Sequence, residues 1–269
     1  MAKEAPINET LRAISKARQE GKYSDLLLAC EDEKMPVHKI IVCPQSPVFD
    51  KACNGPFKER ETGIYEIKDA SIDTVRSMVD YMYTRQYSPT TQPDSVEPSG
   101  ASYPIVFHAR MFELADKYMI VGLQTLAASE FNKALEQETD VCKFLRSVPE
   151  IYSLASTASD KLREAVVWEF RRWIAWQEFD ATVKEVLREV IGNVPQFAEE
   201  LLDSFLDSTL LDECSCSEGR TKRIRRALDI PKCDVCGHYC PRVRREANGP
   251  DFGYLGKVQG LVLYDKDSE

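Results

Sequence analysis

Apolar positions in the N-terminal third of the chain alternate between the spacing of helices and that of strands. Residues 7–19 (INETLRAISKARQ) have the pattern of a short amphipathic helix, and Gly21 ends it. The run YSDLLLAC (23–30) predicts a strand, and a second short strand, MPV (35–37), follows the acidic turn EDEK to complete a hairpin. GIYEIKD (63–69) predicts one more strand. The pattern therefore predicts short strands set between helices.

Helical spacing dominates the next part of the chain. Residues 38–54 contain two prolines and predict two short helices, the second with Pro47 in its first turn behind a Ser46 cap. One apolar face of a longer helix follows, made of Val75, Met78, Val79, Met82 and Tyr83. Residues 104–134 predict two consecutive helices, with Gly122 marking the break between them.

Two segments differ in character from the predicted sheet and helices described so far. Residues 88–102 hold three prolines, four serines and a single large apolar residue, so we expect a mobile loop inside this region. Residues 139–211 are helical in pattern throughout, and their apolar stripes need partners. We therefore expect this segment to be a helical extension packed on the first domain. After Leu211 the periodicity stops, and residues 256–267 suggest one or two terminal strands.

Composition is that of a soluble globular protein, with 43% hydrophobic and 29% charged residues in a chain of 269. No apolar run approaches the roughly 18 residues that a membrane span needs, and the first residues have no hydrophobic stretch resembling a signal peptide. We therefore expect a cytoplasmic or nuclear protein with no membrane partner. Nine cysteines, an odd number, fit free thiols and a metal site better than a disulfide framework.

Charge is distributed unevenly along the chain. Residues 1–211 carry 24 Lys and Arg against 34 Asp and Glu, whereas residues 219–245 carry 9 against 2. An acidic body followed by a short basic segment indicates two functional parts.

Five segments, in this order and spacing, resemble a BTB/POZ domain over about residues 20–134, behind an N-terminal helix within residues 1–19. The matching segments are YSDLLL (23–28), PVHKIIVCPQSPVFDKAC (36–53), FKE (57–59), DYMYTRQY (80–87) and FELADKYMIVGLQTLAASEF (112–131). The helical run that follows, including LREAVVWEFRR and VPQFAEELL, resembles the extension of short fungal BTB proteins.

This resemblance implies an α+β fold with a small mixed sheet flanked by a helical cluster. An α-helical extension at 139–211 and a small Cys-rich element within 212–269 would follow it. The resemblance also implies a non-catalytic protein-interaction module that commonly forms homodimers. Many members are substrate adaptors for cullin-type ubiquitin ligases, and others recruit transcriptional corepressors.

Two residues occupy positions that the resemblance places near the dimer interface. Asp25 and Lys39 stand where dimeric members have a buried aspartate and a basic residue, and a buried charge is tolerated only when it is paired. The alternative is that both are solvated ends of a strand and a helix, since Asp and Lys are rarely fully buried. His38, beside Lys39, is expected to be a structural cap rather than a ligand or a base.

The sequence departs from the cullin-binding pattern at one place. Cullin-binding members often carry an apolar residue, any residue and then Glu in the loop after the third helix. In TRQYSPTTQPDSVEPSG (84–100) the single glutamate, Glu97, has Ser95 two places before it. The cullin hypothesis therefore lacks this support.

A cysteine cluster near the C-terminus suggests a structural zinc site, because Zn²⁺ takes four thiolate or imidazole ligands in a tetrahedron. A C-x2-C pair at 233–236 follows a C-x-C pair at 214–216, with a spacing typical of four-cysteine sites. The expected ligands are Cys214, Cys216, Cys233 and Cys236, with His238 and Cys240 as alternates if an upstream cysteine does not bind. The other interpretations are a loop of free thiols and, with less support, a redox C-x2-C, which needs a helix N-terminus after a strand.

Basic residues around this cluster raise the question of nucleic acid. RTKRIRRALDI (220–230) reads as a helix with a solvated arginine face, and no aromatic residues for base stacking are interleaved. Nucleic acid is therefore the less favoured partner. The alternative function is a nuclear transcription- or chromatin-associated factor whose zinc-stapled tail contacts phosphates. The chain has no H-E-x-x-H, G-x-S-x-G or Gly-rich phosphate motif, so we expect no enzymatic activity.

Overall fold

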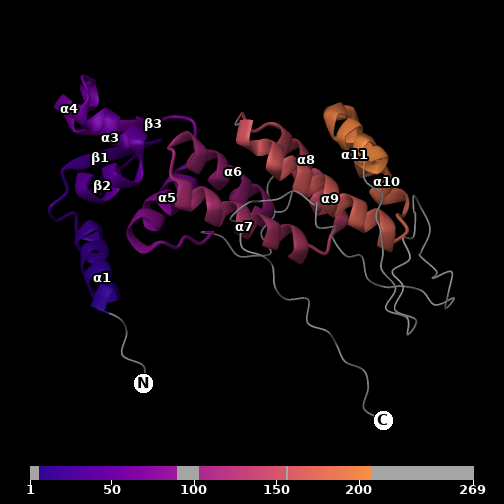
Figure 1. Ribbon diagram of the computed structural model, residues 1–269, viewed down its shortest axis with the longest axis horizontal. Helices are drawn as coiled ribbons and strands as arrows, with labels where there is room; N and C mark the ends of the chain where they lie inside the picture. Colours follow the sequence, from indigo (N-terminus) through magenta and orange to yellow (C-terminus); the bar gives the residue numbers. More distant parts are fainter. Residues whose placement is uncertain (1–5, 90–102, 156, 208–269) are drawn as a thin grey trace, which may run out of the picture.

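A three-stranded mixed sheet lies at one end of the molecule in the computed structural model, which describes residues 6–89, 103–155 and 157–207 (Figure 1). The central strand β1 (Leu26–Cys30) pairs antiparallel with β2 (Glu33–Val37) and parallel with β3 (Ile64–Ile67), in the order β2-β1-β3. Alternate β1 side chains, those of Leu26, Leu28 and Cys30, are buried in the core.

Several helices lie at the same end of the molecule as the sheet (Figure 1). They are α1 (Pro6–Gln19), α2 (Lys39–Val42), the 3-10 turn η1 (Cys43–Gln45), α3 (Pro47–Asn54) and α4 (Lys58–Thr62). The predicted cap of α3 is confirmed, because Ser46 Oγ accepts a hydrogen bond from the backbone N–H of Phe49 at 3.2 Å. Helix α5 (Ile72–Thr84) carries the predicted apolar face into the core.

A helical hairpin forms the middle of the molecule. It consists of α6 (Tyr103–Lys117) and α7 (Val121–Gln137), which pack along each other. The break between them falls at residues 118–120, where Met119 has φ 55°, rather than at Gly122. Gly122 is instead the second residue of α7 and faces the Tyr81 hydroxyl.

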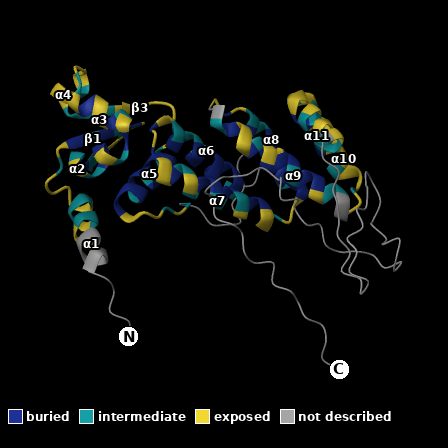
Figure 2. Cartoon of the chain, in the orientation of Figure 1, coloured by how far each residue is buried: buried dark blue, intermediate teal, exposed yellow. Residues whose placement is uncertain are grey.

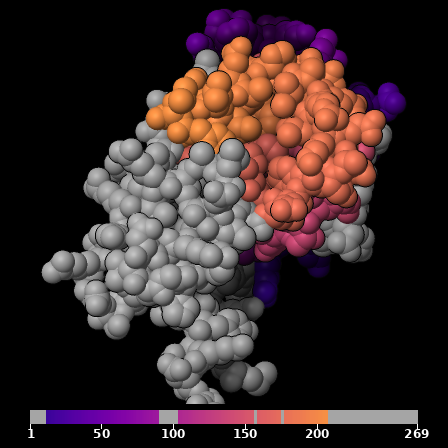
Figure 3. Space-filling model, turned by 90° about the vertical axis from the view of Figure 1, so that its right-hand side faces the viewer, coloured from indigo at the N-terminus to yellow at the C-terminus, as the bar shows by residue number. Residues whose placement is uncertain are grey.

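The C-terminal helices continue the stack beyond this hairpin. They are α8 (Val141–Tyr152), the 3-10 turn η2 (Thr157–Ser159), α9 (Asp160–Trp176), α10 (Ala181–Asn193) and α11 (Pro195–Asp207). Because α8 packs on α6 and α9 packs on α7, the buried hydrophobic residues form one continuous core. Figure 2 shows buried residues from the sheet end through to α9. Figure 3 looks onto the end of the molecule that these last helices form.

The observed fold is the predicted α+β arrangement of a small mixed sheet, a helical cluster and further helices. Besides the position of the helix break, three local features differ from the predictions. The first strand begins at Leu26 rather than at residue 23, because Tyr23 takes φ 62° in a turn. The second strand begins earlier, at Glu33, since only residues 31 and 32 are needed to turn the hairpin. Helix α4 was not predicted. No helix among the described residues is long and apolar enough to cross a membrane.

Candidate protein-interaction surfaces

The residues predicted to bind zinc lie outside the part of the chain that the structure describes. They are Cys214, Cys216, Cys233, Cys236, His238 and Cys240, and the basic segment, the terminal strands and residues 90–102 also fall outside it. Within residues 6–89, 103–155 and 157–207, no group of three or more His, Cys, Asp or Glu side chains could hold a metal ion. The cysteines in these ranges, Cys30, Cys43, Cys53 and Cys142, are free thiols.

His38 has a structural role where β2 meets α2. Its ring is buried, with Nδ1 2.8 Å from the Tyr83 hydroxyl and Nε2 2.8 Å from the carbonyl oxygen of Lys22. The two ring nitrogens are thus occupied by partners within the fold. His38 was predicted to be a structural cap; its side chain makes no cap hydrogen bond to α2, and these contacts with Tyr83 and Lys22 give it a structural role of another kind.

Asp25 and Lys39 meet, but through the backbone rather than through their charges. Asp25 Oδ1 accepts a hydrogen bond of 2.7 Å from the backbone N–H of Lys39. Lys39 is the first residue of α2, so the carboxylate caps that helix from the start of β1, while His38 at the N-cap position makes no side-chain cap bond. The Asp25 side chain remains exposed and that of Lys39 is half-buried within this single chain.

Two large apolar side chains flank this contact and point into solvent. Tyr23 is 87% exposed and Ile40 is 78% exposed, and each lies within two residues of the Asp25–Lys39 hydrogen bond. Apolar side chains beside a polar contact are typical of surfaces that bind protein. We call these four residues the N-terminal surface.

A second candidate surface is a cleft of about 900 Å³ between the sheet end and the C-terminal helices. Its walls come from the β3–α5 turn, from α6, and from the end of α8 with the residues just after it. The floor contains buried Leu114 and Leu154, and the rim carries eight charged residues. The charged residues are Glu31, Lys68, Asp69, Arg110, Glu113, Asp116, Lys117 and Glu150.

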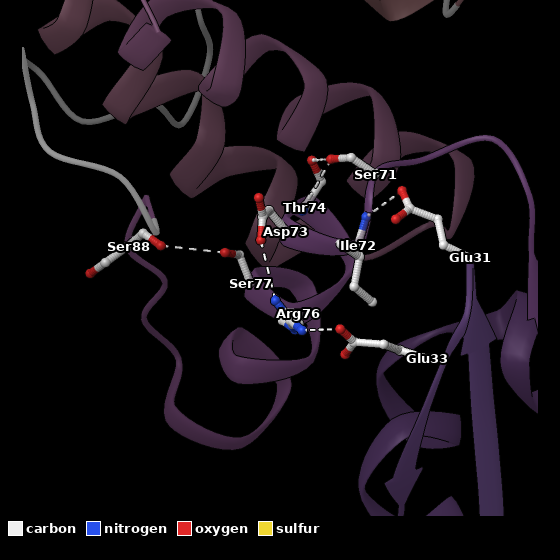
Figure 4. A network of polar contacts seen from close by, with 9 residues as sticks. All are labelled: Glu31, Glu33, Ser71, Ile72, Asp73, Thr74, Arg76, Ser77 and Ser88. Atoms are coloured by element: carbon white, nitrogen blue, oxygen red, sulfur yellow. Dashed lines mark hydrogen bonds and ion pairs between the residues drawn. The ribbon is translucent and has the colours of Figure 1, made fainter. Parts of the chain in front are cut away.

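One wall of the cleft contains the start of α5, and a polar network holds this wall in place (Figure 4). Glu31, at the tip of the β1–β2 hairpin, accepts a hydrogen bond of 3.2 Å from the backbone N–H of Ile72. Ser71 caps the same helix by accepting from the N–H of Thr74. Arg76 reaches from α5 to Glu33 on β2. The hairpin and the first turn of α5 are therefore tied together by side chains from both.

The sequence did not identify Tyr23 or Ile40 as functional residues, and it did not predict the cleft. Tyr23 falls in a predicted strand and Ile40 in a predicted short helix, and neither pattern marks the residue as exposed. A helix of four residues such as α2 is too short for the spacing of its apolar residues to reveal which side faces solvent. The cleft brings together residues far apart in the sequence, and no single-chain pattern signals such a meeting.

Comparisons with known proteins agree with this architecture. The family described as BTB/POZ domain matches residues 14–134. Kelch-like protein 38 of Danio rerio is 26% identical over 102 residues, which cover 38% of this chain and 17% of that protein. Kelch-like protein 3 of Homo sapiens is 24% identical over 88 residues, which cover 33% of this chain and 15% of that protein. The chain thus matches less than a fifth of the length of these relatives.

Two solved structures are also similar to part of the chain. The BTB domain of human gigaxonin is 24% identical, with a TM-score of 0.35, and covers 48% of this chain and 94% of that one. The BTB domain of zebrafish PATZ1 is 15% identical, with a TM-score of 0.36, and covers 51% of this chain and 99% of that one.

Proposed function

Residues 14–134 form a BTB/POZ domain, and from this premise we propose that the protein is a non-catalytic module that dimerises and recruits protein partners. The observation that carries the proposal is the N-terminal surface, where Tyr23 and Ile40 stand exposed beside the Asp25–Lys39 contact. A second copy of the chain would cover these apolar side chains and remove them from water.

The Asp25–Lys39 contact would help to orient the two copies of the chain and would add little to the affinity of the dimer. In a dimer the Asp25 carboxylate would lose water, and its hydrogen bond to the Lys39 backbone would compensate part of that cost. The mass of the full chain in solution tests the proposal, by light scattering coupled to size-exclusion chromatography. We expect twice the chain mass of 30.6 kDa. A monomer at concentrations up to the millimolar range would refute dimerisation.

The finer proposal is that the protein is a substrate adaptor for a cullin-type ubiquitin ligase. Its support is the BTB/POZ domain and the helices packed directly behind it. The missing apolar-x-Glu pattern after α5 counts against it. Pull-down of a purified cullin N-terminal region by the full chain is the test. A chain that dimerises and fails to retain cullin would refute the adaptor role alone.

We also propose a structural Zn²⁺ held by Cys214, Cys216, Cys233 and Cys236, with His238 and Cys240 as alternates. The support is the ligand type and the spacing of the two pairs. Mass spectrometry of freshly purified, reduced protein should show one zinc ion under native conditions, lost on denaturation. Protein without zinc under native conditions would refute the site.

The alternative function is that of a nuclear factor whose tail binds nucleic acid. The observation in its favour is the excess of 9 basic over 2 acidic residues in 219–245. Binding of the full chain to a duplex should then weaken steeply with salt and vanish on deletion of residues 212–269. Binding that survives the deletion would exclude this role for the tail.

A further inference from the structure

We propose that the cleft between the β3–α5 turn, α6 and the end of α8 binds the chain's own basic segment, residues 219–245. This inference does not depend on the proposed dimer, because the cleft shares no residue with the N-terminal surface. It would join the acidic and basic parts of the chain in one contact.

The size and lining of the cleft suit a peptide segment. Its volume of about 900 Å³ lies at the upper end of the range for ligand sites, roughly 300–1,000 Å³. The floor offers apolar contact from Leu114 and Leu154, which are 4% and 9% exposed. The rim above this floor is polar on every wall.

The charge of the rim favours a cationic occupant. Five carboxylates line the cleft against three cations. Two of the cations face carboxylates of the same rim, since Arg110 Nη2 lies 3.0 Å from Glu150 Oε2 and Lys117 pairs with Asp69. The rim therefore keeps an excess of negative charge, and a concave surface concentrates the field of that charge.

The walls are held in place without an occupant. Glu113 on α6 accepts a hydrogen bond of 2.7 Å from the backbone N–H of Ala155, which fixes the segment after α8. Glu31 fixes the opposite wall through Ile72. A cleft that is already shaped loses little conformational entropy when a segment enters it.

Two observations favour the basic segment as the occupant of the cleft: its charge, and its covalent link to α11. The segment 219–245 carries 9 Lys and Arg against 2 Asp and Glu, the opposite sign to the rim. Helix α11 lies against the end of α8, where Glu200 accepts a hydrogen bond from Tyr152. From Glu200 to the end of α11 is about 10 Å of helix.

The connecting residues are long enough to bring the segment to the cleft. The 11 residues 208–218 can span up to about 36 Å when extended, and Tyr152 is next to Ser153 in the cleft wall. A segment tethered at this range has an effective concentration that a free partner would not match. The chain's own tail is therefore the favoured occupant over a basic segment of another protein.

Zero-length carbodiimide cross-linking of the full chain tests the proposal. Lys222 and Lys232 should form amide bonds to cleft carboxylates, identified by peptide mass spectrometry. The yield should fall about 5-fold between 50 and 500 mM salt, because screening shortens the reach of the charges. Mixing isotopically light and heavy chains separates contacts within one chain from those between two, and we expect cross-links within one chain.

Two matched variants identify the source of the attraction. Reversal of three tail charges (R223E, R225E and R226E) should abolish the cross-links. Reversal of three exposed charges on α3 and α4 (K51E, K58E and R60E) changes net charge equally and should leave them intact. Three results would each overturn the proposal. They are cross-links spread over distant carboxylates such as Glu185 and Asp203, no cross-links at all, and cross-links only between light and heavy chains.

Discussion

The hydroxyl of Tyr83 lies 2.8 Å from the backbone nitrogen of His38 and 2.8 Å from Nδ1 of the same residue. The backbone N–H donates to the hydroxyl oxygen, so the hydroxyl proton is directed at Nδ1. Nε2 then carries the ring proton and donates to the Lys22 carbonyl. Burial raises the pKa of Tyr83, which keeps this donor protonated. One side chain of α5 thus fixes the junction that carries the N-terminal surface.

Replacing Tyr83 with phenylalanine should destabilise the fold by about 1–3 kcal/mol, because two buried polar groups of His38 lose their partner. Thermal unfolding followed by circular dichroism measures the change. Tyr23→Phe is the matched control, since that side chain is 87% exposed and should leave stability unchanged. Equal melting temperatures for the two variants would contradict the role of the shared hydroxyl.

Gly122 is required because a Cβ at this position would stand 2.4 Å from the Tyr81 hydroxyl oxygen. Tyr81 is 5% exposed and cannot move aside freely. Gly122→Ala should therefore destabilise the protein by about 1–3 kcal/mol, despite the better helix propensity of alanine. Tyr81→Phe in the same chain removes the oxygen and should recover most of the loss, which chemical denaturation of the double mutant would reveal.

Gly192 in α10 provides the control for this prediction. A Cβ there meets nothing within 4 Å, so Gly192→Ala should stabilise the protein by about 0.4–1 kcal/mol. A loss of similar size at both glycines would mean that the Tyr81 contact is not the cause.

Most of the fold could be read from periodicity and capping, and the exceptions have physical reasons. The Ser46 cap and the apolar face of α5 are local signals, and both are present in the structure. The helix break was misplaced, because Gly122 serves a tertiary contact with Tyr81 while Met119 adopts the left-handed turn. A sequence shows that a glycine is present, but not which neighbour requires it.

The candidate surfaces were less accessible to sequence reasoning. Asp25 and Lys39 were singled out from a family resemblance, and the structure joins them through the Lys39 backbone, which a charge-pair argument does not anticipate. The cleft depends on Glu31, Glu113 and Glu150, which come from three distant segments. Their proximity arises from the packing of α8 on α6, and packing partners are not encoded in the spacing of either helix.

His108 should make stability depend on pH. It is buried against Tyr87, whose hydroxyl lies 2.8 Å from Nδ1, and Glu130 and Lys133 are the charges that act on it. Desolvation lowers the pKa of His108 from 6.5 to about 4. The unfolded chain binds a proton at His108 more readily than the folded chain does. The contribution of neutral His108 to the free energy of unfolding is therefore full above pH 6.5 and is lost as pH falls towards 4.

The expected loss across that window is roughly 3 kcal/mol. It can be measured as the free energy of unfolding in urea at several pH values for the wild type and for His108→Asn. The wild type minus variant difference should shrink as pH falls from 6.5 to 4. A difference that stays constant over this range would show that the imidazole does not titrate as stated.

Phe170 should hold the C-terminal helices together. Its ring centroid lies 6.0 Å from that of Phe144, 5.7 Å from Phe179 and 5.6 Å from Phe197. Phe170→Ala should cost about 3–5 kcal/mol through the cavity it leaves. All three tryptophans lie in α9, so fluorescence reports on this helix and far-ultraviolet circular dichroism on the whole chain.

Because α9 packs on α7, both signals should shift to lower denaturant together in this variant. If the fluorescence midpoint moved while circular dichroism kept a second, unshifted transition, the extension and the BTB domain would be separate folding units.

Ile40→Asp should convert a dimer of this protein into a monomer. The side chain is 78% exposed in the single chain, so the substitution disturbs little of the protomer, but a carboxylate in the buried centre of an interface would be desolvated without a partner. The nearby Asp25 would add repulsion from the same protomer. Leu206→Asp is the matched control, because Leu206 is 74% exposed and belongs to α11, which lies at the opposite end of the molecule from the sheet (Figure 1). Sedimentation velocity at equal concentrations should show a monomer for the first variant and an unchanged dimer for the second. If only the Leu206 variant were a monomer, the dimer interface would lie on α11 and not on the N-terminal surface.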